Sequence, residues 1–161
     1  MKPIGVLVNP AANRGRGNLV GEQVFSQLAK AGIPAINLSA ESAIAAANKA
    51  QVAISDQEIS GVIAVGGDGT TQLGVNICVP NQIPLGIVPA GSGNDQAREL
   101  GIELGNPKSA IDNILQSLDS PKRVDVMRVA TDEREFWSFG SISAGFDAIC
   151  AKRANGLKWP K

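Results

Sequence analysis

Short apolar runs alternate along the chain with longer segments whose apolar residues recur at helical spacing. The runs are uncharged and rich in valine and isoleucine, which favour β-strands. None approaches the roughly 18 residues of a membrane span. Four of the runs predict strands, at residues 3–9, 33–38, 61–65 and 83–88.

The segments between these runs predict helices. Ser39, together with Ser42 or Glu41, is expected to cap an alanine-rich helix, and Gly32 is placed to end the helix before it. Asn106 followed by a proline has the pattern of a helix start. The predicted helices cover residues 19–32, 39–54 and 106–118, with a short one that ends at residue 101.

The last part of the chain predicts two strands, at residues 122–130 and 135–146, and a partial helix at 147–157. An acidic turn joins the two strands. Because strands and helices alternate and the strands are almost continuously apolar, the sequence predicts an α/β fold. We expect a doubly wound, mostly parallel, Rossmann-like sheet in one domain, without internal repeats.

Three loops that follow predicted strands carry glycine together with Asn, Asp, Ser or Thr. They lie at residues 9–17, 66–72 and 89–95. Ligands of such sheets bind outside the carboxyl ends of the strands, where glycines let the backbone approach a phosphate. Tight turns with helix caps are the simpler interpretation of each loop alone. The presence of all three at one edge favours a phosphate site.

Composition narrows the chemistry that this chain can perform. Its 15 basic and 15 acidic residues balance, so no basic surface indicates a nucleic-acid partner. The two cysteines, Cys78 and Cys150, lack metal-type spacing and fit a reduced, cytoplasmic setting. Because histidine is absent, Ser-His-Asp and Cys-His machinery and histidine zinc sites are excluded. Chemistry done by positioning and electrostatics, such as phosphoryl transfer, fits the composition.

Two motifs carry a family resemblance. "GGDGT" at residues 66–70 and "PAGSGNDQAREL" at 89–100 resemble the N-terminal nucleotide-binding domain of diacylglycerol kinases. That family includes sphingosine kinases and bacterial lipid kinases and is distantly linked to NAD kinases and phosphofructokinases. "VNPAANRGRG", "VDV" and "SAGFDA" support the resemblance, which spans nearly the whole chain. The "GSGND" turn followed by Ala97 and Arg98 points to lipid kinases rather than NAD kinases.

The resemblance implies ATP and Mg²⁺ as cofactors and assigns roles by position, with no residue as a direct metal ligand. Asp68 would act catalytically, through Mg²⁺ or polar contacts at the transferred phosphoryl group; capping of N–H groups is its alternative role. Gln72 and Leu73 stand where the family often has Asn and Glu. The nucleotide would contact Asn9, Ser39, Gly66, Gly67, Asp68, Gly69, Thr70, Thr71, Gln72 and Ser92, and the acceptor would contact Asn94, Asp95 and Asp147, the last of which is alternatively a helix cap.

The resemblance also implies the reaction. A lipid kinase transfers the γ-phosphoryl group of ATP to the hydroxyl of a diacylglycerol-like or sphingoid lipid at a membrane surface. Family members continue into a β-rich domain with an Asp-Gly-Glu segment, which this chain lacks. We therefore expect residues 1–161 to be the nucleotide-binding domain of a longer enzyme, cytoplasmic or peripheral at the membrane. Alone, it should be inactive and should self-associate through residues 136–159.

Two other functions compete with this interpretation. One is a nucleotide-binding module without activity, and the other is a small-molecule kinase similar to NAD kinase. A dinucleotide dehydrogenase is disfavoured, because no G-x-G-x-x-G motif follows the first strand with an acidic residue at the end of the second.

Overall fold

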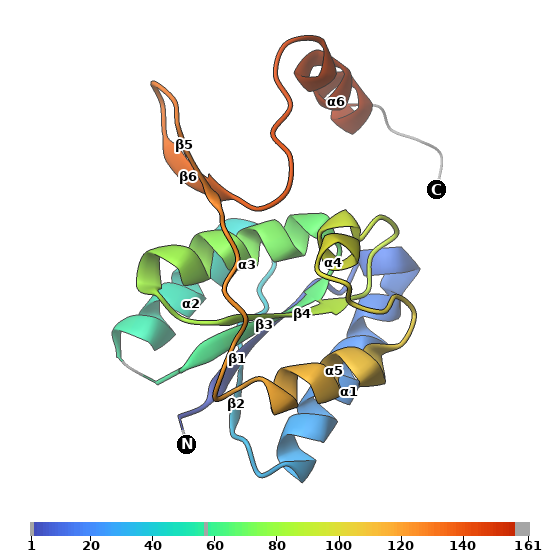
Figure 1. The fold of residues 1–161 in the computed structure, drawn as a ribbon, viewed down its shortest axis with the longest axis vertical. Helices are drawn as coiled ribbons and strands as arrows, with labels where there is room; N and C mark the ends of the chain where they lie inside the picture. The colour runs from blue at the N-terminus through green and yellow to red at the C-terminus, as the bar shows by residue number, and fades with distance from the viewer. Residues whose placement is uncertain (1, 57, 157–161) are drawn as a thin grey trace.

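Four parallel strands form the central sheet of the computed structural model, which describes residues 2–56 and 58–156. The strands are β1 (Ile4–Val8), β2 (Ala35–Asn37), β3 (Gly61–Gly66) and β4 (Leu85–Pro89). Their order is β2-β1-β3-β4 (Figure 1). β2 thus pairs with one edge of β1, and β3 pairs with the other edge of β1. The predicted mostly parallel sheet is confirmed.

Helices cover both faces of the sheet, as in a doubly wound fold (Figure 1). On one face, α1 (Arg16–Lys30) and α5 (Pro107–Gln116) bury Leu28 and Ile111 against Val6. On the other face, α2 (Ala43–Ser55) and α3 (Asp68–Asn81) form a second core. The members of the second core that come from α2 are alanines spaced three or four residues apart: Ala46, Ala50 and Ala53.

The predicted capping residues of two helices, α2 and α5, can be compared with the hydrogen bonds that the structure shows. Ser42 caps α2, because its Oγ accepts a hydrogen bond from the Ala45 N–H at 3.1 Å. Ser39 is not part of that cap; its Oγ accepts a hydrogen bond from the N–H of Val8 at 3.0 Å. Asn106 caps α5 as predicted, and its Oδ1 accepts from the Ser109 N–H at 3.1 Å. The loop after β1 contains a short 3-10 turn, η1 (Ala12–Gly15).

The C-terminal third forms smaller elements than the sequence predicts. The strands β5 (Met127–Ala130) and β6 (Glu135–Ser138) pair as an antiparallel hairpin. Residues 122–126 are largely exposed and irregular, and the second predicted strand ends early because Gly140 and Gly145 have positive φ. Two helices complete the fold: α4 (Asp95–Glu99) and α6 (Phe146–Gly156). The last residue of the predicted final helix, Leu157, is outside the described residues.

Among the described residues, the structure contains no helix with both the length and the apolar character needed to cross a membrane.

The two cysteines are expected to differ in reactivity. Cys78 is buried in α3, and burial raises the pKa of its thiol to about 12, whereas Cys150 is exposed. At pH 8 a thiol reagent should label Cys150 and spare Cys78 until the chain unfolds.

The raised pKa of Cys78 also predicts how stability depends on pH. Between pH 9, the pKa of a thiol in the unfolded chain, and pH 12, only the unfolded chain loses the Cys78 proton, so the free energy of unfolding should fall as pH rises. Urea unfolding at pH 8 and 10 tests this prediction, and in Cys78→Ala the pH dependence should shrink.

Candidate functional site

The three glycine-rich loops lie together at the carboxyl edge of the sheet. The N–H of Asn9 donates to Val65 O at 2.9 Å, so the loop after β1 starts beside the end of β3. The N–H of Ala90 donates to Gly66 O at 2.8 Å, which starts the loop after β4 on β3's other side. The strand order reverses between β1 and β3, and that crevice is where open α/β sheets bind ligands.

The loops after β3 and β4 are in direct backbone contact. A Cβ atom built on Gly91 would lie 2.4 Å from the Cα of Gly67 and 2.9 Å from the Asn94 Oδ1. Real Cβ atoms do not come this close to a backbone atom, so glycine is required here for steric reasons. Gly67 and Gly91 therefore bring the two loops together.

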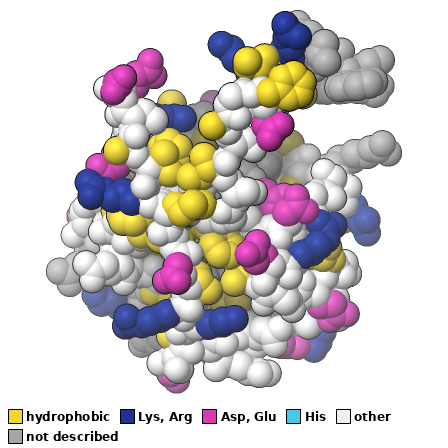
Figure 2. Space-filling view, turned by 45° about the horizontal axis from the view of Figure 1, so that its top comes forward, with side chains coloured by type: hydrophobic (Ala, Val, Ile, Leu, Met, Phe, Trp, Pro, Cys, Tyr) yellow, Lys and Arg dark blue, Asp and Glu magenta, His cyan; other side chains and the backbone are white. Residues whose placement is uncertain are grey.

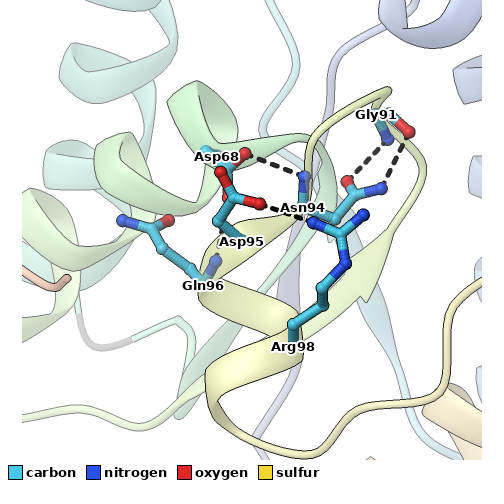
Figure 3. A network of polar contacts seen from close by, with 6 residues as sticks. All are labelled: Asp68, Gly91, Asn94, Asp95, Gln96 and Arg98. Atoms are coloured by element: carbon cyan, nitrogen blue, oxygen red, sulfur yellow. Dashed lines mark hydrogen bonds and ion pairs between the residues drawn. The ribbon is translucent and has the colours of Figure 1, made fainter.

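A polar network locks this contact (Figure 3). The carboxylate of Asp68 accepts from the Asn94 N–H at 2.8 Å through Oδ2 and from the Gln96 N–H at 3.0 Å through Oδ1. The Asn94 side chain closes its own loop, since Oδ1 accepts from the Gly91 N–H at 2.9 Å and Nδ2 donates to Gly91 O at 2.8 Å. Asp68, the first residue of α3, thus caps the N-terminal end of α4.

This network corrects one expectation about Asn94. The resemblance implies that Asn94 caps the start of a short helix, and this capping role is the expectation that the structure corrects. Its position before α4 is confirmed, but its side chain makes no capping bond and it is buried, at 8% exposure. The physical reason is its left-handed backbone, with φ of 62°, which turns the side chain back toward Gly91.

The start of α3 provides the open part of the site. A Cβ atom at Gly69 would meet no atom within 4 Å outside its own turn of helix. The Thr70 N–H donates to Gly67 O at 2.9 Å, whereas the N–H groups of Asp68 and Gly69 have no carbonyl of a preceding helical turn to bond. Thr70 and Thr71 of the same turn are buried, and the Thr71 Oγ1 donates to Gly67 O at 3.4 Å. Anion contacts here would come from the backbone of the turn, while both threonines face inward.

Asn9 and Ser39 lie at the neighbouring strand ends, after β1 and β2. The Asn9 Oδ1 accepts from the Ala11 N–H at 3.1 Å, and Ser39 holds the end of β1 through Val8. Ser39 also lines a small cavity of about 200 Å³ beside α1, together with Phe25. Ser92 is exposed on the loop between β4 and α4. Asn9, Ser39 and Ser92 thus follow the carboxyl ends of β1, β2 and β4.

A larger cleft, of about 640 Å³, opens between α3 and the β5–β6 hairpin. Asp68 and Gly69 line one part of it, and apolar side chains line much of the rest. Figure 2 shows hydrophobic side chains gathered in a hollow of this face, between two projecting arms. The apolar residues that line the cleft are Leu73, Phe136, Phe139 and Ile142.

Three amide side chains hold the hairpin in place. Asn76 pairs with the backbone of Trp137, accepting from its N–H at 2.8 Å and donating to its carbonyl at 2.8 Å. Gln72 donates to the same carbonyl, and Gln96 donates to Phe139 O at 2.5 Å. Gln72, expected at the nucleotide, therefore contacts the hairpin in this structure.

Two other predicted acceptor residues, Asp95 and Asp147, take no part in these bonds to the hairpin. Asp95 is exposed at the start of α4 and pairs with Arg98 at 2.5 Å. Asp147 lies in α6, whose described side chains are all exposed and which projects away from the sheet (Figure 1). The structure does not bring Asp147 to the loops.

The donor set does not form a magnesium site made of protein alone. Both oxygens of Asp68 already accept backbone hydrogen bonds, and Asp95 pairs with Arg98. Among residues 2–56 and 58–156, no three Cys, Asp or Glu side chains are grouped to hold a metal ion. Mg²⁺ is commonly held by substrate phosphates with one or two carboxylates, so the ion implied by the resemblance would accompany the nucleotide.

Asn76, Gly91 and Gln96 are site residues that the sequence pattern alone did not single out. Asn76 lies four residues after Gln72 on α3, so the two amides share one helix face, and this spacing was the available signal. Gly91 and Gln96 stand inside the quoted "GSGND" region, but their partners are 24 to 43 residues away in the chain.

Comparison with known proteins identifies the family of this chain. Residues 3–129 match the diacylglycerol kinase catalytic domain. A Mycobacterium tuberculosis diacylglycerol kinase is 31% identical over 159 residues, covering 98% of this chain and 50% of the relative. A Bacillus subtilis diacylglycerol kinase is 31% identical over 131 residues, covering 80% and 42%.

A solved diacylglycerol kinase structure from Bacillus anthracis superposes with a TM-score of 0.59 at 26% identity, covering 71% of this chain and 42% of that one. The chain spans about half the length of these curated relatives. The match over residues 3–129 includes all three loops at the carboxyl edge of the sheet. This chain belongs to the diacylglycerol kinase catalytic domain family.

Proposed function

We propose that this domain binds ATP for a lipid kinase that phosphorylates the hydroxyl of a diacylglycerol-like or sphingoid alcohol. The observation that carries the proposal is the open first turn of α3, which lies at the edge where the strand order reverses. There the N–H groups of Asp68 and Gly69 and the helix dipole favour an anion such as a phosphate chain. The kinase names of the relatives support the same reaction class.

The chain's own residues would bind and orient the reactants. Backbone N–H groups near Gly69 would hold the phosphates, while Asn9 and Ser39 would border the rest of the nucleotide beyond β1 and β2. The cleft between α3 and the hairpin begins beside the same turn, and its phenylalanine, leucine and isoleucine side chains suit the apolar body of a lipid alcohol. A hydroxyl entering this cleft would approach the phosphates. Phosphoryl transfer depends mainly on such positioning.

Nucleotide binding can be tested by titrating ADP with Mg²⁺ into the isotope-labelled chain and following backbone amide signals by NMR. We expect the largest shifts at residues 66–72 and at Ser92, with smaller ones at Asn9 and Ser39. Shifts located only on the far edge of the sheet, or none at millimolar ADP, would contradict the proposal.

The Gly69→Ala substitution should lower ADP affinity without lowering the stability of the domain. Alanine is a better helix former than glycine, and the added methyl meets no protein atom, so the stability should stay equal or rise by about 0.5–1 kcal/mol. The same methyl would occupy the space where a phosphate approaches the turn, and ADP affinity should fall by about 10-fold, the equivalent of one lost hydrogen bond.

Gly156→Ala is the matched control, because Gly156 is also helical and open but lies at the end of α6. Calorimetric titration and urea unfolding of both variants give the two quantities. Unchanged ADP affinity in Gly69→Ala would remove the α3 turn from the site.

A further inference from the structure

Asp68 occupies an unusual position between two helices. It is the first residue of α3, and its carboxylate reaches across to the N-terminal end of α4. Negative charge is favourable at a helix N-terminus, and here one carboxylate serves two of them. Each oxygen accepts a separate backbone N–H, at 2.8 and 3.0 Å, as Figure 3 shows for the Asn94 bond.

These bonds have a mechanical consequence for the loops. Asn94, the residue that Oδ2 holds through its N–H, closes the turn onto Gly91 with two side-chain bonds. Gly91 in turn touches the backbone of Gly67, one residue before Asp68. The contacts form a closed circuit from Asp68 through Asn94 and Gly91 back to Gly67, so the spacing of the two loops is fixed.

We propose that Asp68 is a positioning residue that sets the spacing of the two phosphate-facing loops through its bonds to the backbone of α4. The inference rests on the proposed nucleotide site. It follows from the two carboxylate oxygens, each of which accepts a backbone amide at the start of α4 and so ties the first residue of α3 to that helix. Asp95, whose carboxylate is exposed beside the same helix, lacks this arrangement.

The experiment compares Asp68→Asn with the matched control Asp95→Asn in the whole chain, measuring ADP affinity with Mg²⁺ and with EDTA. An asparagine can accept only one of the two amides, and its NH₂ opposes the other. Asp68→Asn should therefore weaken ADP binding by about 10-fold, equally with and without Mg²⁺, since hydrogen bonds to charged groups are the strong ones. Asp95→Asn should stay within about 2-fold of wild type, as expected for an exposed pair.

Amide hydrogen exchange gives a readout that does not need the nucleotide. In Asp68→Asn the Asn94 and Gln96 amides should exchange about 10-fold faster, while those of β1 and β3 keep their wild-type rates. Unchanged exchange at Asn94 and Gln96 would overturn the inference. A loss of ADP affinity confined to the Mg²⁺ arm would also overturn it and would make Asp68 a metal ligand.

Asn94→Gly covers the case in which Asp68→Asn fails to fold. Glycine accepts the positive φ of this position and removes both bonds to Gly91 while leaving the Asp68 carboxylate in place. It should weaken ADP binding in both metal conditions, and wild-type affinity would contradict the role of loop spacing. If the wild-type chain itself binds no ADP, the proposed function fails, and the exchange rates in Asp68→Asn still decide whether the carboxylate holds α4.

Discussion

Gly91→Ala is expected to destabilise the domain by about 3 kcal/mol, the upper range for overpacking a well-packed position. Its new methyl would lie 2.4 Å from the Cα of Gly67, and neither backbone can rotate away as a side chain would. The two loops would have to separate, which would also break the bonds between Asn94 and Gly91. ADP binding should be lost beyond measurement, because both phosphate-facing loops move.

Urea unfolding followed by circular dichroism, with calorimetric ADP titration, measures both effects of Gly91→Ala. Gly69→Ala is the contrast within the same site, since that methyl enters open space. A Gly91→Ala chain with wild-type stability would show that the loops are farther apart than the structure places them.

Asn76→Ala is expected to release the hairpin from the domain. The substitution removes both hydrogen bonds between Asn76 and the Trp137 backbone. The partly buried Trp137 N–H is left unpaired, a cost of about 1–3 kcal/mol, while the Trp137 carbonyl keeps its bond from Gln72. The loss should be local, because the sheet and its two cores do not depend on this contact. The amides of Trp137 and Phe139 should then exchange at least about 10-fold faster, while β3 amides keep their rates.

Asn81→Ala is the matched control for this prediction. Asn81 lies on the same helix and donates to the carbonyl four residues earlier, as Asn76 does, but it does not contact the hairpin. Hydrogen exchange measured by NMR distinguishes the two variants. Equal exchange at Trp137 in Asn76→Ala and wild type would mean that other contacts hold the hairpin.

Local signals in the sequence were enough to predict the sheet. Apolar runs marked all four of its strands, and the pair Asn106–Pro107 marked the start of α5, because each signal lies within the element that it specifies. The glycine loops were likewise placed at one edge, since parallel strands end together. The hairpin was predicted as a strand pair, but with longer strands than the structure has. The second strand, β6, ends early because Gly140 and Gly145 take positive φ and the extended run stops before them.

The sequence could not show how the site is held together. Whether the Asp68 carboxylate caps local N–H groups or reaches another element depends on residues 26 and 28 positions later. The same applies to the hairpin, where amides on α3 find backbone atoms more than 60 residues away. Only the three-dimensional approach of α4 and β6 to α3 decides these partners, so residue type and spacing left them open.

The attachment of the hairpin through its main chain has a consequence for how this fold can diversify. Asn76, Gln72 and Gln96 bind the peptide groups of residues 137 and 139, and every amino acid except proline supplies both halves of such a group. The side chains of the hairpin wall can therefore change while its anchorage persists. Substitutions at positions such as 136, 139 and 142 would then change the lining of the cleft, while the opposite wall, built on α3, retains the turn proposed to bind the nucleotide.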